Sequence, residues 1–151
     1  PRLPPGDRHL PPDHGSAPKR DGETRPPRGA DLQRLGIRTS LNMDPDPEQI
    51  KLAAQTGTDR IELYTEAYAR ACATGTEVES VLAQFVRAAE TAADEGLGLN
   101  AGHDLDLNNL PRFATVPGLL EVSIGHALVV DAIRMGLAPT IGAYQRALGN
   151  L

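Results

Sequence analysis

Two short apolar runs that each end in Gly-His constrain the fold of this chain more than any other feature of its sequence. They occupy residues 97–103 and 119–126, and only the segment 104–118 separates them. That segment has room for a short helical or irregular crossover, and strands joined by a crossover pair in parallel. We therefore expect neighbouring parallel strands whose Gly-His ends share one edge of a sheet, where parallel α/β folds build their active sites.

The chain from residue 31 onward repeats the order of strand then helix. A strand is predicted over residues 37–43, after which Asp-Pro-Asp-Pro supplies a cap residue and early prolines that open a helix. The other predicted elements are a helix at 48–55 that stops at Gly57, a strand at 60–65, a helix with apolar period from Val78 to Ala89 that Gly96 ends, and closing helices at 127–135 and 140–148.

Four consecutive strand–helix units fit either a small open doubly wound sheet or half of an eight-stranded barrel. The sequence has neither a Gly-rich dinucleotide fingerprint nor a Walker-type loop, which disfavours the nucleotide-binding form of the open sheet. We therefore predict an α/β fold, namely the C-terminal half of a (βα)8 TIM-type barrel. Because only 3% of the residues are aromatic and none is Trp, the core is expected to consist of Leu, Ile, Val and Ala.

The N-terminal segment has a different composition from the rest. Eight of the 13 prolines fall in the first 28 residues, among Arg, Asp and Gly and without an apolar period. Such a segment buries too little surface to offset the entropy of ordering it. We predict that residues 1–30 form a Pro-rich irregular leader and that residues 31–151 form the half-barrel.

Charge and cysteine content restrict the class of protein. The net charge is −5 and no basic cluster occurs, so no nucleic-acid partner is expected. A phosphorylated metabolite remains compatible, because helix N-termini and backbone amides bind phosphate. The single cysteine, Cys72, excludes an internal disulfide and a Cys-rich zinc site, and no apolar run approaches the roughly 20 residues of a membrane helix. A cytoplasmic protein without a membrane partner is expected.

The two strand-end histidines are the first candidates for chemistry. His103 follows Ala-Gly, so the backbone can approach a ligand while the imidazole acts as general acid or base. The alternative is a surface histidine that caps the loop. His126 precedes an apolar helix, where the amides of Gly125, His126 and Ala127 form an anion site with or without the imidazole.

Glu62 is the third candidate. Alternation places it on the strand face opposite Ile61 and Leu63, and in a barrel one of these faces is the interior. A carboxylate there is costly unless it is paired or used, although an outward position on an edge strand explains the same pattern. With His103 and His126 it forms no recognisable metal-binding pattern, so no metal site is predicted.

Several motifs together resemble the pyridoxine 5'-phosphate synthase family of vitamin B6 biosynthesis. They are residues 40–47, 60–65, 100–105 and 123–128, and the resemblance extends from about residue 32 to residue 148. The resemblance implies a (βα)8 barrel that condenses 1-deoxy-D-xylulose 5-phosphate with 3-amino-2-oxopropyl phosphate to pyridoxine 5'-phosphate, phosphate and water. It also implies a cytoplasmic homo-oligomer, an octamer in complete members, without an organic cofactor.

The resemblance assigns roles to five residues. His103 matches the proton donor, and Glu62 matches a carboxylate that stabilises the transition state. Asp104, Gly125 and His126 match positions that hold the aminoketone phosphate. Asp104 replaces a glycine of some members, a change that a backbone amide contact tolerates.

Other features that the resemblance implies have no counterpart in this chain. These are an Asn-x-Asp-His segment, a histidine and a glutamate that accept protons, and the arginines that bind substrate phosphate. In the leader, Asp7, Arg8 and residues 13–15 retain a trace of a degraded fourth unit. We therefore expect a truncated member that exposes an apolar barrel interior and is inactive alone. The alternatives are a non-catalytic phosphate-binding or assembly module and an unrelated phosphosugar-processing barrel.

Overall fold

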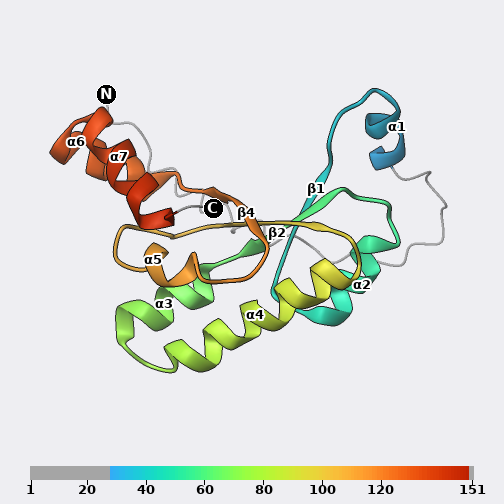
Figure 1. The fold of residues 1–151 in the computed structure, drawn as a ribbon, viewed down its shortest axis with the longest axis horizontal. Helices are drawn as coiled ribbons and strands as arrows, with labels where there is room; N and C mark the ends of the chain where they lie inside the picture. The colour runs from blue at the N-terminus through green and yellow to red at the C-terminus, as the bar shows by residue number, and fades with distance from the viewer. Residues whose placement is uncertain (1–27, 150–151) are drawn as a thin grey trace, which may run out of the picture.

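The computed structural model describes residues 28–149, so the predicted leader lies almost entirely outside the described residues. The structure contains a four-stranded sheet with helices packed on one side of it and further helices near its two ends (Figure 1). In chain order the elements are α1 (Arg28–Arg34), β1 (Ser40–Met43), α2 (Pro47–Ala54), β2 (Arg60–Tyr64), α3 (Glu66–Thr74), α4 (Val78–Asp94), β3 (Gly98–Gly102), α5 (Leu110–Phe113), β4 (Leu119–Ser123), α6 (His126–Met135) and α7 (Leu137–Leu148).

The strands lie in the sheet in sequence order, β1-β2-β3-β4, and all three pairs are parallel. This confirms that the two Gly-His runs are adjacent parallel strands ending at the same edge. A doubly wound sheet reverses its strand order at a switch point, whereas consecutive strands of a barrel are always neighbours. The arrangement is consistent with part of a TIM-type barrel.

Helices α2 to α5 lie on one side of the sheet and bury its apolar face (Figure 1). Ile61 and Leu63 of β2 point to this side and are fully buried. At the centre of the core, the ring centroid of Phe113 lies 5.1 Å from that of Tyr68 and 5.2 Å from that of Phe85. The expectation of a purely aliphatic core is therefore wrong, because three of the chain's five aromatic residues pack together in it.

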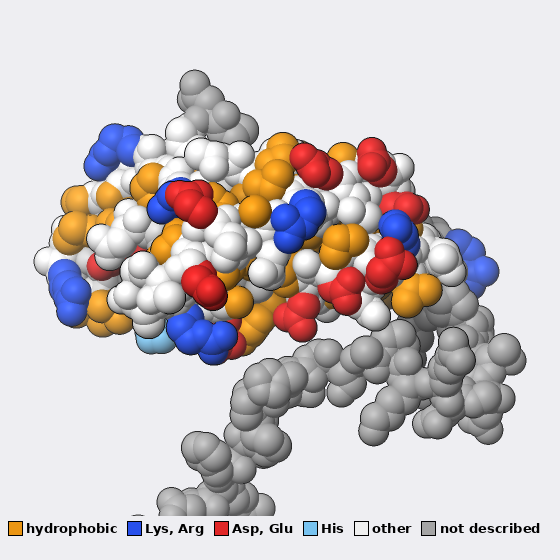
Figure 2. Space-filling view, turned by 90° about the horizontal axis from the view of Figure 1, so that it is seen from below, with side chains coloured by type: hydrophobic (Ala, Val, Ile, Leu, Met, Phe, Trp, Pro, Cys, Tyr) orange, Lys and Arg blue, Asp and Glu red, His pale blue; other side chains and the backbone are white. Residues whose placement is uncertain are grey.

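The outer surface of these helices is mixed in character. Figure 2 shows Asp, Glu, Lys and Arg side chains interspersed with apolar ones on this side. In the described part of the chain, no helix has the length and apolar character needed to cross a bilayer.

Most element boundaries differ from the predicted ones by a few residues, and two helices were not predicted. The strand expected at 37–43 begins only at Ser40, and α1 and α3 are additional. Helix α3 ends at Gly75, which has a left-handed φ of 69° and accordingly terminates the helix. A break was expected at 136–139, but only Gly136 separates α6 from α7, because Pro139 fits in the first turn of α7.

The sheet face opposite helices α2 to α5 carries a mainly polar surface. One row of paired residues across the four strands consists of Asn42, Glu62, Asn100 and Glu121. The expectation of an exposed apolar interior is therefore wrong for this face. Because neighbouring strand residues alternate between faces, apolar residues cover the helix side and leave polar residues on the other.

Candidate active site

A cleft of about 980 Å³ opens at the carboxyl ends of β3 and β4, beside the middle of β2. All five residues selected from the sequence line it, and they come from three different strands or strand ends. The five are Glu62, His103, Asp104, Gly125 and His126. The cleft walls are the loop after β3 and the beginning of α6, so the parallel sheet brings together residues up to 64 positions apart.

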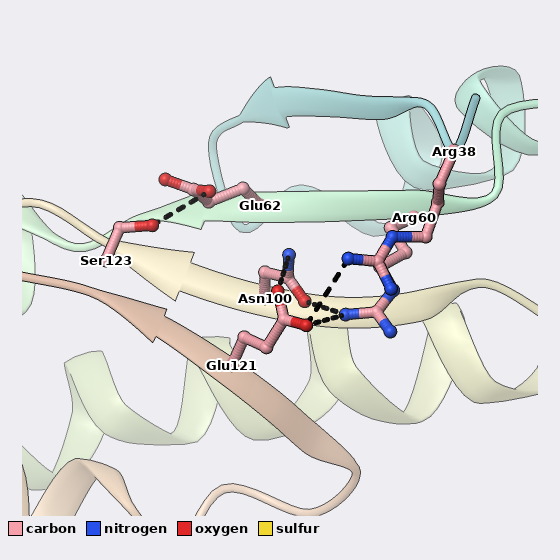
Figure 3. A network of polar contacts seen from close by, with 6 residues as sticks. All are labelled: Arg38, Arg60, Glu62, Asn100, Glu121 and Ser123. Carbon is pink, nitrogen blue, oxygen red and sulfur yellow. Dashed lines mark hydrogen bonds and ion pairs between the residues drawn. The ribbon is translucent and has the colours of Figure 1, made fainter.

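Glu62 enters the cleft from the polar face of β2. Its Oε2 accepts a hydrogen bond from Ser123 Oγ at 3.2 Å, and this bond crosses the intervening strand β3 (Figure 3). Gly102 of β3 makes the crossing possible, since a Cβ at that position would lie 2.8 Å from Glu62 Oε1. The structure therefore places Glu62 on the polar face, paired with a hydroxyl.

A second polar cluster lies at the opposite end of the same face. Arg60 Nη1 is 2.9 Å from Glu121 Oε1 and donates to Asn100 Oδ1 at 3.0 Å, while Arg38 also approaches Glu121 (Figure 3). Gly98 leaves room for the Arg60 side chain, because a Cβ there would lie 2.8 Å from Arg60 Cγ. The charged groups of this cluster pair with one another, and the cluster lies outside the cleft.

His103 is exposed and follows β3 with an unusual backbone conformation. Its φ is +98°, and the next residue, Asp104, has a φ of +56°. Its imidazole stacks on Tyr64 at the end of β2, with ring centroids 4.3 Å apart and an angle of 33° between the planes. Its carbonyl oxygen accepts a hydrogen bond from the Thr65 hydroxyl.

Asp104 takes up a left-handed conformation that glycine adopts without strain and that Asp tolerates better than most residues. Its carbonyl oxygen accepts a hydrogen bond from Asn109 Nδ2 at 3.0 Å, and Asp106 Oδ1 accepts from the Asn108 and Asn109 amides. A glycine at this position would therefore also be compatible with this geometry. The loop is held by its own side chains, and α5 begins directly after it.

Gly125 and His126 form the beginning of α6. The helix starts at His126, and no side chain caps it at Gly125. The first amides of a helix have no partner within the helix and carry partial positive charge, so they favour an anion. No atom lies within 4 Å of a Cβ built at Gly125, which leaves the cleft open at that point.

Four residues of the site were not predicted from the sequence. Tyr64 and Thr65 hold His103, Gly102 makes space for Glu62, and Arg134 of α6 is the only Lys or Arg that lines the described cleft. Tyr64 was accessible from the pattern, because it lies two residues after Glu62 and so shares its strand face. The other three depend on packing between elements distant in the sequence.

The electrostatic character of the cleft is mixed. Four carboxylates line it, those of Glu62, Asp104, Asp106 and Asp131. Burial, followed by the charges of Glu66 and Asp104, raises the pKa of the Tyr64 phenol. Tyr64 is therefore neutral around pH 7. Among residues 28–149, no group of three or more His, Cys, Asp and Glu side chains is arranged to hold a metal ion.

The sequence matches one protein family and many curated relatives. The family model of "Pyridoxal phosphate biosynthesis protein PdxJ" matches residues 3–150, which includes most of the Pro-rich segment. A pyridoxine 5'-phosphate synthase of Xanthomonas campestris is 50% identical over 143 residues, covering 94% of this chain and 56% of the relative. That of Albidiferax ferrireducens is 45% identical over 139 residues, covering 91% and 55%.

A third pyridoxine 5'-phosphate synthase, from Bacteroides thetaiotaomicron, is 52% identical over 114 residues, or 75% of this chain and 47% of the relative. The chain thus spans about half the length of the curated relatives it matches. The family match covers nearly all of the chain, and it agrees with the motifs that form the cleft. The chain therefore belongs to the PdxJ family of pyridoxal phosphate biosynthesis proteins.

Proposed function

We propose that the cleft is the C-terminal part of a pyridoxine 5'-phosphate synthase active site. The reaction is the condensation of 1-deoxy-D-xylulose 5-phosphate with 3-amino-2-oxopropyl phosphate to pyridoxine 5'-phosphate, phosphate and water. One observation carries the proposal: the five residues that match the family's functional positions converge on a single cleft from three strands. The relatives are named pyridoxine 5'-phosphate synthases, which supports the same product.

The residues divide the work according to their chemistry. The amides at Gly125 and His126 bind the phosphate of the aminoketone, because the N-terminus of α6 favours an anion. His103, exposed at the cleft, donates a proton to the oxygen that leaves as water. Glu62 stabilises positive charge that develops on the substrate, and the Ser123 hydroxyl fixes the orientation of its carboxylate. No organic cofactor takes part.

We further propose that residues 31–151 are half of a (βα)8 barrel, preceded by a leader over residues 1–30. The in-order parallel sheet, with helices α2 to α5 packed on one of its faces, supports this, since consecutive strands of a barrel are neighbours and its helices lie on the outside. The proton acceptors that the family resemblance implies have no counterpart in these residues. The chain alone is therefore expected to bind the aminoketone phosphate without turning it over, and a homo-oligomer of complete barrels is the active form.

The test is a calorimetric titration of the chain with 3-amino-2-oxopropyl phosphate, followed by an assay for product with both substrates. The Gly125→Ala variant adds a methyl group to open space in the cleft, so it should fold normally. The methyl group would occupy space beside the first amides of α6, where the phosphate is proposed to bind, and should weaken binding by about 1.5–3 kcal/mol, as much as the loss of one hydrogen bond to a charged group. The matched control is Gly142→Ala in α7, outside the cleft, which should bind like the wild type.

Binding that is unaffected by Gly125→Ala contradicts the assignment of the phosphate site. Binding that persists in a complemented barrel without product formation favours the alternative function, a non-catalytic phosphate-binding module.

A further inference from the structure

His103 occupies a backbone conformation that its neighbours must enforce. A φ of +98° is rare for any residue with a Cβ, and the following Asp104 is also left-handed, with φ +56°. Strained residues of this kind persist only where surrounding contacts hold them, and they gather at functional sites. The side chain of His103 is exposed and lies at the wall of an open cleft, so few contacts are available to hold it.

Two consecutive residues at the end of β2 supply these contacts. Tyr64 places its ring against the imidazole with centroids 4.3 Å apart, close enough to restrict rotation of both rings. Thr65, fully buried, donates its hydroxyl proton to the His103 carbonyl oxygen, and its amide donates to the Gly102 carbonyl oxygen at 2.9 Å. One residue thus holds the side chain of His103 and the next holds its backbone.

The use of Thr65 departs from what its position favours. Thr65 is the residue that precedes α3, where a threonine hydroxyl commonly accepts a hydrogen bond from a helix amide. Here the hydroxyl makes no such bond, and helix α3 begins without a side-chain cap. The hydroxyl is directed to the His103 carbonyl oxygen instead. The start of α3 therefore lacks the stabilisation of a side-chain cap, and the Thr65 hydroxyl contacts the loop that carries His103.

Tyr64 is also dispensable for the core. It lies on the polar face of β2, is only partly buried, and is absent from the cluster of core residues formed by its neighbours Ile61 and Leu63. Its ring contributes to His103 rather than to the packing of helices against the sheet.

We propose that Tyr64 and Thr65 are positioning residues that hold the His103 imidazole in one orientation at the cleft. This inference rests on the proposed function, in which His103 donates a proton to the substrate. Proton transfer requires the donor to lie within hydrogen-bond reach of the reacting group, so an imidazole that rotates freely is a poorer donor. The stacked ring restricts the orientations that the imidazole can adopt where it lines the cleft.

The test uses NMR of the 151-residue chain with isotope-labelled histidine, which has only four histidines. The ring current of Tyr64 should shift the His103 ring protons upfield, and His103→Gln identifies these signals. Tyr64→Phe keeps a stacked ring and should keep the shift, whereas Tyr64→Leu should lose it. The His126 signals serve as an internal control, since no aromatic ring stacks on that residue in the described structure.

Thr65 is tested by the pair Thr65→Ser and Thr65→Val. Serine keeps the hydroxyl and should leave one set of His103 signals, whereas valine removes the hydroxyl and should broaden or duplicate them. Should Tyr64→Leu fold with the His103 signals of the wild type, or should Thr65→Val retain a single unchanged set, the proposed positioning is wrong. If Thr65→Val does not fold, the tyrosine pair decides the matter.

The same variants separate this inference from the proposed function. In a complemented barrel, Tyr64→Leu should lower kcat and leave the KM for the aminoketone phosphate unchanged, and Tyr64→Phe should restore kcat. A wild-type barrel without turnover would refute the proposed function, while the ring-current shift would still establish the contact. Equal kcat values for the wild type and Tyr64→Leu would refute the positioning role alone.

Discussion

Replacing Gly102 by alanine should displace the carboxylate of Glu62, because that glycine is the space over which it lies. A Cβ at position 102 would be 2.8 Å from both Glu62 Oε1 and Ser123 Cβ, and 3.1 Å from the Ser123 carbonyl oxygen. Ordinary contacts begin at 3.4 Å, so two atoms must each give way by about 0.6 Å. Glu62 can rotate away, but the Ser123 atoms belong to the neighbouring strand and can move only with it.

Overpacking of this kind typically costs about 1–3 kcal/mol, and the fixed backbone of β4 places this site toward the upper end. We therefore expect the free energy of unfolding of Gly102→Ala to fall by about 2–3 kcal/mol in urea titrations followed by circular dichroism. The hydrogen bond from Ser123 to Glu62 should be lost in the same variant, which the carboxyl carbon resonance of Glu62 would report.

The matched control is Gly98→Ala, four residues earlier on the same strand and the same face. Its Cβ would meet Arg60 Cγ at 2.8 Å and Leu120 Cδ1 at 3.2 Å, which are side-chain atoms outside the cleft. This variant should lose about 1 kcal/mol, at the lower end of the range, and retain the Glu62 resonance. A Gly102→Ala variant that is as stable as the wild type, or a Glu62 resonance that shifts equally in both variants, would show that Gly102 does not make room for the Glu62 carboxylate.

Three further predictions concern stability. Phe113→Ala should reduce the free energy of unfolding by about 3–5 kcal/mol in urea titrations, since the ring is fully buried; a loss below 1 kcal/mol would contradict its place in the core. Hydrogen bonds from Thr39 and from the Gln33 side chain lower the pKa of Asp59 below its ordinary 3.8. Their stabilisation is present above that value and is lost as the pH falls through the folded-state pKa, so Asp59→Asn should flatten the acid dependence of the urea midpoint below about pH 5. Burial, with the hydrogen bond to Asp131, raises the pKa of Tyr144 above its ordinary 10.0. Stability should therefore decline as the pH rises above that value, and Tyr144→Phe should lose this alkaline decline together with about 1 kcal/mol at pH 7.

The sequence carried the order and type of most elements because their signals are local. Alternation in residues 60–65 correctly placed Glu62 opposite Ile61 and Leu63, and the Gly-His motifs correctly predicted adjacent parallel strands. Helix α3 was missed because it contains no Leu, Ile or Val, and its burial depends on Tyr68, which packs against Phe85 and Phe113.

The candidate site was predictable only as a set of residues. Its five members could be selected from motifs, but the neighbouring residues that hold them in position could not. Gly102 carries no local sign that a carboxylate crosses over it, and the stacking of Tyr64 on His103 joins residues 39 positions apart. Such contacts arise from the register of β2 and β3, which tertiary packing fixes.

The two glycines of β3 also explain why Arg60 and Glu62, on the same sheet face, form separate polar contacts at its two ends. Gly98 admits Arg60 to its partners Asn100 and Glu121 at one end, and Gly102 admits Glu62 to its hydroxyl partner at the other. Arg60 is thereby kept occupied by Glu121, and the carboxylate of Glu62 remains free of a cationic partner in the described structure. A carboxylate that contacts only a hydroxyl is available to pair with a cationic group in the cleft.

The proposed synthase activity would be measured as the formation of pyridoxine 5'-phosphate by a complemented barrel. The chain would be produced together with the part of the Xanthomonas campestris relative that the match does not cover, and product would be measured with both substrates present. We expect product from the wild type, loss of kcat in Glu62→Gln with the KM values retained, and no product from the chain alone. A purified complex that forms no product, or one in which Glu62→Gln turns over at the wild-type rate, would contradict it.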